Sequence, residues 1–391
     1  MTSVTYDLAV VGLGGMGSAV LQHAAERGLS VCGIEQYPPV HTLGASHGKA
    51  RMIRKAYFED PAYVPLLFRA YELWEDLERK SGRSVLRKTG ALVAGRPESA
   101  IVAGVRASAE LHGLAIEVYD AADLRRRFPM MRPLDDEIGT FESDAGTIHP
   151  EVAVSAQFDL AKKAGATARF STRVVSWERT GAGAFSVLLD DGSEVRARKL
   201  ALCLGAWLDP ARAELPLTIE IRRKVQAWFT PRSDAFAFGT CPAFMIERTS
   251  DFGGRLYGFP DFGDGVKAAF HSGGEPTTIE KLDRLIAFEH DVAPIQRALE
   301  TWMPGSATRC RMATVCHYDM TRDEHFIVGL HPDDSNLIVA GGFSGHGFKF
   351  APVVGEIVAD LAEAGGTRHD VAFLSPARFG KGEIIGRLPI A

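Results

Sequence analysis

The chain has 391 residues and a formal net charge of −5. Hydrophobic residues make up 46% of it and charged residues 24%, a mixture that can build a large core in two domains or one elaborated domain. It contains no basic tract and no run of about 20 apolar residues, so we expect neither nucleic acid nor a membrane as a partner. The N-terminus lacks the features of a secretory signal, and the five cysteines form no close pair. We therefore expect a cytoplasmic protein without a disulfide framework or a zinc site.

The N-terminal residues predict a strand–helix–strand unit followed by a long helix. Residues 6–12 predict a buried strand, residues 14–28 a glycine turn and helix, and residues 29–36 a second strand. A unit of this kind favours a parallel sheet with helices packed on it. Residues 60–82 then predict an amphipathic helix, which Gly82 ends.

The rest of the chain alternates between strand and helix signals, without repeats or low-complexity segments. In chain order we expect a strand at 90–95, helices at 97–113, 120–129 and 150–166, a strand at 166–179, a hairpin at 184–207 turning at Asp190-Asp191-Gly192, antiparallel strands between 220 and 275, a helix at 277–299, and a strand–loop–helix at 336–366. Parallel-sheet signals occur at both ends of the chain. Any division into two domains is therefore interleaved.

The first turn carries a dinucleotide-binding motif. The sequence Gly12-Leu13-Gly14-Gly15-Met16-Gly17 follows a strand and opens a helix. The first glycine permits the tight turn, the second lets the backbone approach a pyrophosphate, and the third allows close helix–strand packing. Glu35 stands 18 positions after Gly17 (35 − 17), where a carboxylate can accept hydrogen bonds from ribose hydroxyls. The motif alone does not distinguish FAD from NAD.

The C-terminal stretch "GGFSGHGFKFAPVVGEIVADL" (341–361) decides between these cofactors, because together with the N-terminus it resembles the monomeric sarcosine oxidase and N-methyltryptophan oxidase family. The resemblance covers nearly the whole chain. It also includes "SHGKARMIRKAY" (46–57), "YVPLLFRAYELW" (63–74), "KTGALVAG" (88–95), "LYGFPDFGDGVKAAFH" (256–271) and "ATVCHYDMTRDEHFIVGLHP" (313–332).

The resemblance implies that FAD is the cofactor and that the sulfur of Cys316 is joined to the 8α-methyl group of the flavin. A thioether would keep the cofactor attached and alter the electronics of its ring, while the protein supplies orientation. The other four cysteines match no functional position. The residues implied to bind the cofactor are Gly12, Gly14, Gly17, Glu35, Cys316, Gly345 and Gly347.

For the substrate, the resemblance implies a carboxylate clamp of Arg54 and Lys349. Arginine can bind a carboxylate with two hydrogen bonds, and lysine adds a point charge. Tyr257, Tyr318 and Met245 match residues that line the family's substrate cavity. The alternative for a single arginine or lysine is a solvated surface charge.

The resemblance also implies a catalytic set. Lys267 matches a lysine over the flavin where oxygen is activated, and a cation there would stabilise the charge that forms on O2. His271 matches a histidine beside the amine, and His47 and Arg51 match residues that face the flavin. The cluster at 323–326 lacks a second ligand pair at metal-site spacing, so we expect no metal.

The implied fold is α/β, with a Rossmann-like FAD-binding domain at residues 1–85, 146–220 and 318–385. The substrate domain, at residues 86–145 and 221–317, is expected to contain a mixed or antiparallel sheet. The implied reaction is oxidative N-demethylation of sarcosine or a related N-methyl amino acid by a monomeric enzyme. Dioxygen is consumed, and formaldehyde, the primary amino acid and hydrogen peroxide are formed.

Some positions depart from the family pattern, notably Ser46, which precedes His47, and His317, which follows Cys316. The sequence does not choose between sarcosine and a bulkier N-methyl amino acid such as N-methyltryptophan. A cyclic imino acid such as proline or pipecolate is a further alternative. Two other classes of protein remain open: a nicotinamide-dependent dehydrogenase and a flavin-binding module without catalytic activity.

Overall fold

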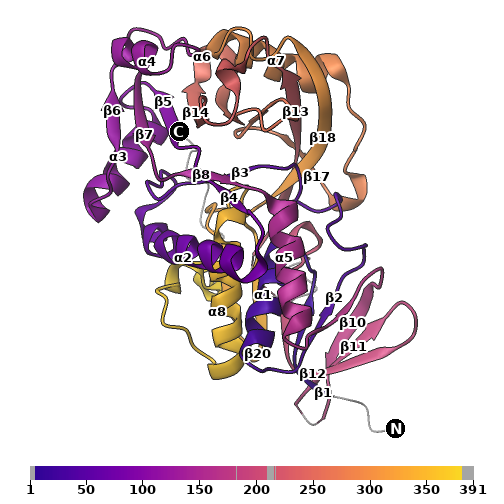
Figure 1. Cartoon of the computed structure of the whole chain (residues 1–391). Helices are drawn as coiled ribbons and strands as arrows, with labels where there is room; N and C mark the ends of the chain where they lie inside the picture. The colour runs from indigo at the N-terminus through magenta and orange to yellow at the C-terminus, as the bar shows by residue number, and fades with distance from the viewer. Residues whose placement is uncertain (1–4, 182, 209–214, 216, 381–391) are drawn as a thin grey trace.

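The computed structural model describes residues 5–181, 183–208, 215 and 217–380. Two large sheets occupy opposite halves of the molecule, and a small three-stranded sheet lies between them (Figure 1). The small sheet has the order β3-β8-β4, with β3 at Arg51–Ile53, β8 at Gly146–Ile148 and β4 at Leu86–Arg87. No helix among the described residues is long and apolar enough to span a membrane.

The lower sheet in Figure 1 has eight strands and contains the predicted parallel unit. Its order is β10-β11-β12-β1-β2-β9, with β20 pairing to β12 and β19 pairing to β20. The strands are β1 (Thr5–Val11), β2 (Val31–Ile34), β9 (Thr167–Arg169), β10 (Val174–Arg179), β11 (Phe185–Leu189), β12 (Glu194–Leu202), β19 (Ile327–His331) and β20 (Asp334–Gly341).

The central strand β1 is buried on both faces, as expected for the middle of a parallel sheet. Leu8 and Val10 pack into the core on the helix side, whereas Ala9 and Val11 pack into a separate core on the other side. Both neighbours of β1, β2 and β12, run parallel to it. On the helix side, α1 (Gly15–Glu26) lies between α5 (Pro150–Lys163) and α8 (Ala351–Ala364) (Figure 1). The helix α2 (Val64–Ser81) packs on α5 and α8, and Gly82 ends it in the left-handed conformation, as predicted.

The upper sheet has nine strands in the order β17-β13-β16-β15-β14-β5-β7-β6, with β18 pairing to β13. The strands are β5 (Ala91–Gly95), β6 (Glu117–Tyr119), β7 (Ile138–Glu142), β13 (Glu220–Thr230), β14 (Ala243–Arg248), β15 (Gly254–Phe259), β16 (Val266–Phe270), β17 (Glu275–Thr277) and β18 (Arg309–Met320). The helices in this half are α3 (Ala100–His112), α4 (Ala121–Arg127), α6 (Thr249–Phe252) and α7 (Ala293–Trp302). One parallel pair, β5 with β14, makes this sheet mixed, so the expected α/β fold with a mixed or antiparallel sheet is confirmed.

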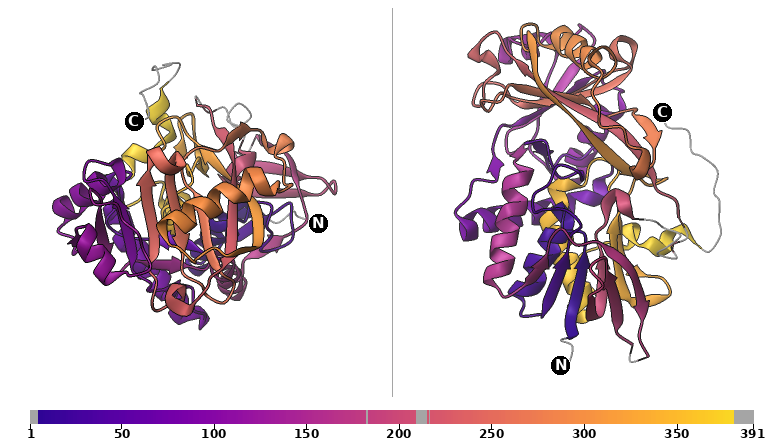
Figure 2. Two further views of the ribbon diagram at one scale, coloured as in Figure 1. Left: turned by 90° about the horizontal axis from the view of Figure 1, so that it is seen from above. Right: turned by 90° about the vertical axis from the view of Figure 1, so that its right-hand side faces the viewer.

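The chain passes between the two halves more than once, and the side view in Figure 2 shows the two sheets stacked one above the other. The lower sheet takes its strands from residues 5–34, 167–202 and 327–341, and the upper one from residues 91–142 and 220–320. The domain boundaries expected from the sequence remain a proposal. One of them, between residues 317 and 318, falls inside β18.

Two expected elements were wrong in extent. The predicted helix at 277–299 is regular only from Ala293, because Arg223 on β13 donates hydrogen bonds to the carbonyl oxygens of Asp283 and Leu285 and holds that segment in an irregular conformation. The predicted single strand at 166–179 is two strands, β9 and β10, separated by a bend in which Ser171 has φ +53°. In both cases a contact or bend outside the periodic pattern decided the backbone conformation.

Candidate active site

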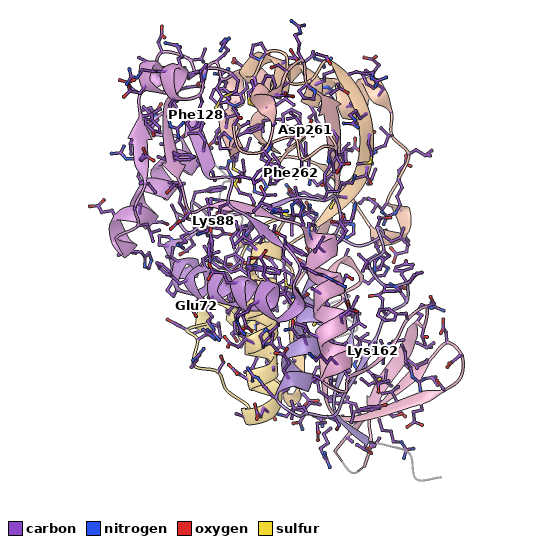
Figure 3. The ribbon with its side chains drawn as sticks, in the orientation of Figure 1. Glu72, Lys88, Phe128, Lys162, Asp261 and Phe262 are labelled. Atoms are coloured by element: carbon purple, nitrogen blue, oxygen red, sulfur yellow. The ribbon has the colours of Figure 1, made fainter. Side chains whose placement is uncertain are left out.

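A cavity of about 490 Å³ runs between the two halves of the molecule. Residues at the ends of β1, β2 and β12 line one part, and residues from β13, β14, β15 and β18 line another. The space that appears between the ribbons in Figure 1 is largely filled with side chains, as Figure 3 shows, so the cavity is defined by those side chains. Of the 16 site residues predicted from the sequence, the cavity wall contains Gly12, Gly14, Glu35, Arg51, Arg54, Met245, Tyr257, His271, Cys316, Tyr318, Gly345, Gly347 and Lys349.

One end of the cavity is the glycine turn between β1 and α1. Gly12 has φ +86°, and a Cβ atom there would collide with the carbonyl oxygen of Cys203 on the neighbouring strand connection. Gly17 does not line the cavity, but a Cβ at this position would collide with the carbonyl oxygen of Gly12. Glu35 accepts hydrogen bonds from the backbone N–H of Leu13 at 2.8 Å and of Tyr37 at 3.1 Å. The carboxylate therefore holds the turn together at the place where a ribose is expected.

Cys316 lies further along the cavity, on β18, and is 3% exposed. It is paired across the sheet with Lys224 of β13, and its Sγ lies 4.0 Å from Nη2 of Arg51. Arg51 is held by the carbonyl oxygens of Ala45 at 2.7 Å and Ala50 at 2.9 Å. This arrangement places a fixed positive charge beside the thiol.

The two predicted clamp residues meet around one aromatic ring. The guanidinium of Arg54 lies 5.0 Å from the centre of the Tyr57 ring, and the ammonium of Lys349 lies 5.1 Å from it. Lys349 donates a hydrogen bond of 2.7 Å to the carbonyl oxygen of His346, and burial lowers its pKa to about 7. The two cations are only 3% and 5% exposed, so neither is a solvated surface charge.

Glu59 completes this group and was not expected from the sequence. Its Oε2 lies 2.8 Å from Nη2 of Arg54. Burial alone would raise the pKa of Glu59, but Arg54, His346 and Lys349 outweigh it and lower the pKa to about 2. In the sequence Glu59 stands beside Asp60, the residue that caps the next helix, so an acidic helix start was the simpler interpretation.

Aromatic side chains form the adjoining wall. The Nδ1 atom of His271 lies 3.3 Å from the hydroxyl of Tyr318, and the ring of Tyr257 meets the His271 ring edge-on with centroids 6.3 Å apart. Burial lowers the pKa of His271 well below its ordinary value, so the imidazole is neutral. Met245 lies beside Tyr257 across the β14–β15 pair and is 5% exposed. The wall is therefore largely aromatic, and its polar groups include two hydroxyls and one neutral imidazole.

The structure does not bring His47 and Lys267 to the cavity wall. Lys267 is 1% exposed, and its ammonium donates hydrogen bonds to the carbonyl oxygens of Gly48 at 2.6 Å and Ala50 at 2.8 Å. His47 is also 1% exposed, and burial together with Arg51 lowers its pKa to about 3. These two side chains form a layer behind the segment that carries Arg51.

Sequence reasoning missed Lys224. This lysine lines the cavity beneath the Tyr318 ring, at 4.9 Å from the ring centre, and burial lowers its pKa to about 7. A lysine in the middle of a strand gives no sequence signal, because a strand exposes alternate residues and charge is common on the solvated face. His317, noted as unusual, also lines the cavity and packs edge-on against Trp207 with centroids 6.0 Å apart.

The groups that line the cavity fit FAD. A glycine turn and the N-terminus of α1 face one end of the cavity, where they can receive a pyrophosphate, and the long cavity continues past Cys316 to the cations. A family model described as FAD dependent oxidoreductase matches residues 7–361.

The chain belongs to this family.

Individual relatives agree with this assignment. The chain is 41% identical over 384 residues to the monomeric sarcosine oxidase of Streptomyces avermitilis. The matched region covers 96% of this chain and 98% of that protein. It is 35% identical over 378 residues to the N-methyl-L-tryptophan oxidase of Escherichia coli O157:H7, with 96% and 99% covered. The fold is also similar to the solved structure of NikD, an unusual amino acid oxidase essential for nikkomycin biosynthesis, with a TM-score of 0.84, 25% identity, and 96% and 98% covered. The resemblance inferred from the sequence is thus confirmed, and FAD is the family's cofactor.

Proposed function

We propose that the protein is an FAD-dependent oxidase of N-methyl amino acids, which forms formaldehyde, the primary amino acid and hydrogen peroxide. The observation that carries the proposal is the pair of buried cations, Arg54 and Lys349, in the same cavity as the dinucleotide turn. Relatives named monomeric sarcosine oxidase and N-methyl-L-tryptophan oxidase support it. When bound, the flavin supplies the hydride acceptor and the route of electrons to O2.

The side chains of the cavity each have a task in this reaction. Arg54 and Lys349 bind the carboxylate of the substrate through charge-assisted hydrogen bonds. Tyr257, Tyr318 and His271 enclose the amine and exclude water. The surrounding cations and the neutral imidazole disfavour a protonated amine, because like charges repel strongly in a buried site. The substrate is therefore held as the neutral amine, the form that can release a hydride.

We propose that Cys316 carries the flavin through a thioether. Its thiol lies in the cavity wall, with 4.0 Å between its Sγ and Nη2 of Arg51. Cys203 also lines the cavity, but burial raises the pKa of its thiol to about 12. Acid precipitation should leave the yellow colour in the pellet of the wild type and release it from Cys316→Ser, whereas Cys203→Ser and the half-buried control Cys310→Ser should keep it. A flavin mapped to another residue, or to none, would reject this linkage.

The activity is tested with a panel of secondary amino acids. Purified holoenzyme is mixed with sarcosine, N-methyltryptophan, proline and pipecolate, and hydrogen peroxide and formaldehyde are measured. Equal amounts of peroxide and formaldehyde from an N-methyl amino acid are expected, whereas a cyclic imino acid would give peroxide alone. The proposal fails if no secondary amino acid bleaches the flavin, or if turnover requires a nicotinamide. We also propose that the protein is a monomer and that it is located in the cytoplasm. Sedimentation equilibrium would test the oligomeric state.

A further inference from the structure

Tyr57 lies against both clamp cations without lining the cavity. It is 0% exposed, and its ring centre is 5.0 Å from the guanidinium carbon of Arg54 and 5.1 Å from the ammonium nitrogen of Lys349. The residue is not part of the cavity wall, so a substrate in the cavity does not contact it. Two like charges in a buried site repel strongly, whereas a cation over an aromatic ring is attracted by the negative face of the ring. One ring therefore offsets part of the repulsion between the two cations of the clamp.

The hydroxyl of Tyr57 is held by His346, and the direction of this hydrogen bond follows from the other bond of the imidazole. Nε2 of His346 lies 3.0 Å from the carbonyl oxygen of Glu324, which can only accept, so Nε2 carries the proton. Burial lowers the pKa of His346 to about 4, so the imidazole is neutral and its Nδ1 is an acceptor. The Tyr57 hydroxyl, 2.6 Å away, therefore donates to Nδ1. This hydrogen bond fixes the position of the ring.

His346 also holds one of the cations that the ring faces. Its carbonyl oxygen accepts a hydrogen bond of 2.7 Å from Nζ of Lys349. This is the one hydrogen bond that Nζ makes to the described residues, so two of the three N–H groups of the ammonium remain for a carboxylate. Tyr57, His346 and Lys349 thus form a connected unit in which the ring and the ammonium have fixed relative positions.

The charge of Lys349 depends on a small set of neighbours. Burial lowers the pKa of Lys349 to about 7, the Glu59 carboxylate opposes this effect, and the guanidinium groups of Arg54 and Arg51 add to it. His346 is neutral and contributes no charge. The charged and neutral forms of Lys349 are therefore closely balanced near pH 7, and one further interaction of moderate strength shifts the balance measurably.

We propose that Tyr57 is a positioning residue of the carboxylate clamp, and that its ring holds Arg54 and Lys349 together as a pair of cations before an anion binds. His346 keeps the ring and the ammonium in place through its imidazole and its carbonyl oxygen. The inference rests on the proposed function and deepens it, because the clamp is the carboxylate site of that function.

The experiment changes the electron density of the ring while keeping its shape. Tyr57 is replaced with phenylalanine, or with a phenylalanine whose three ring fluorines draw electron density away from the ring face. The affinity of each holoenzyme for pentanoate is measured from the flavin spectrum across neutral pH. The wild type and Tyr57→Phe should lose affinity above about pH 7, and the fluorinated form above about pH 6, because a buried cation–π contact corresponds to roughly one pKa unit. The fluorinated form should then bind about tenfold more weakly than Tyr57→Phe at about pH 8, but within about threefold of it at about pH 6.

Tyr71 on α2 provides the matched control. Its buried ring lies 4.8 Å from the ammonium of Lys55, and neither residue lines the cavity. The same fluorinated residue in place of Tyr71 should leave the pH dependence of pentanoate binding unchanged. Lys349→Met should bind pentanoate weakly at every pH, whether or not the ring at position 57 carries fluorine.

The inference is overturned if the fluorinated form loses affinity equally at every pH, because the ring would then have only a structural role. It is also overturned if fluorination changes nothing, or if the affinity of the wild type does not depend on pH. A wild type that oxidises no secondary amino acid but shows the shift on fluorination refutes the proposed function and supports the role of Tyr57. An active oxidase without the shift refutes the role of Tyr57 and leaves the proposed function standing.

Discussion

Replacing Arg54 with methionine should have two separable effects, on ligand binding and on stability. The guanidinium is 3% exposed and bonded to Glu59 at 2.8 Å, so its loss removes half of the clamp and leaves a buried carboxylate without its cation. Losing a charged hydrogen bond to a ligand costs about 1.5–3 kcal/mol, which is about 10- to 150-fold in affinity for a carboxylate such as pentanoate.

The stability effect follows from the pKa of Glu59. The fold lowers that pKa from 4.5 to about 2, which corresponds to about 3 kcal/mol of stabilisation. Because the pKa is lowered, the stabilisation is complete above about pH 4.5 and is lost as the pH falls towards 2. Arg54 is the largest of the cations that produce this shift, and removing one member of a buried ion pair costs about 3–5 kcal/mol, so Arg54→Met should unfold with a free energy smaller by about that amount at pH 7.

The double variant Arg54→Met/Glu59→Gln separates the two effects. It removes the uncompensated charge, so its free energy of unfolding should recover by about 2 kcal/mol or more, while its affinity for pentanoate should stay low. Arg255→Met is the matched control, since Arg255 pairs with Glu247 at 3.4 Å nearby but neither residue lines the cavity. Urea unfolding and titration of the flavin spectrum supply the measurements. Wild-type affinity in Arg54→Met, or recovered affinity in the double variant, would refute the clamp.

Three further predictions concern Lys349, Lys267 and Gly12. Burial lowers the pKa of Lys349 to about 7, so the ammonium loses its proton, and its attraction for a carboxylate, above that pH. The affinity for pentanoate should therefore fall by up to about tenfold per pH unit above pH 7 in the wild type, and this pH dependence should be absent from Lys349→Met. If Lys267 serves oxygen, as the family resemblance implies, Lys267→Met should slow turnover with O2 by about 10²–10³ while leaving turnover with a dye acceptor within about tenfold; because Lys267 is held behind the Arg51 segment by the carbonyl oxygens of Gly48 and Ala50, an equal loss with both acceptors would instead assign it to positioning that segment. Gly12→Ala should yield protein without bound FAD, since its Cβ would collide with the carbonyl oxygen of Cys203, and an absorbance spectrum with normal flavin content would disprove the argument.

Local signals in the sequence predicted much of the fold. The glycine turn, the long helix that Gly82 ends and the hairpin at Asp190-Asp191-Gly192 were all found where expected. Each depends on residues close together in the chain, such as a glycine with a positive φ or a regular apolar spacing. The helix predicted at 277–299 was wrong in extent. A distant residue, Arg223, decides the path of its first part through hydrogen bonds to the carbonyl oxygens of Asp283 and Leu285.

Some residues of the candidate site were likewise predicted from the sequence, and others were not. The family motifs pointed to Arg54, Lys349 and Cys316, and the structure places all three in one cavity. Their roles remain proposals. Glu59 and Lys224 could not be found from the sequence, since an acid before a helix and a lysine in a strand are ordinary until the fold shows what surrounds them.

The sequence by itself determined the dinucleotide turn, the parallel α/β unit and membership of a flavoprotein family, because these depend on residue types at fixed short spacings. Only the tertiary structure decided the charge balance of the cavity. Arg54 and Lys349 are almost 300 positions apart, and Lys224 and Cys316 meet only because β13 and β18 pair in register. Whether a charge is buried, and which groups can neutralise it, depends on strands and loops that are distant in sequence, and burial is what makes these charges energetically important.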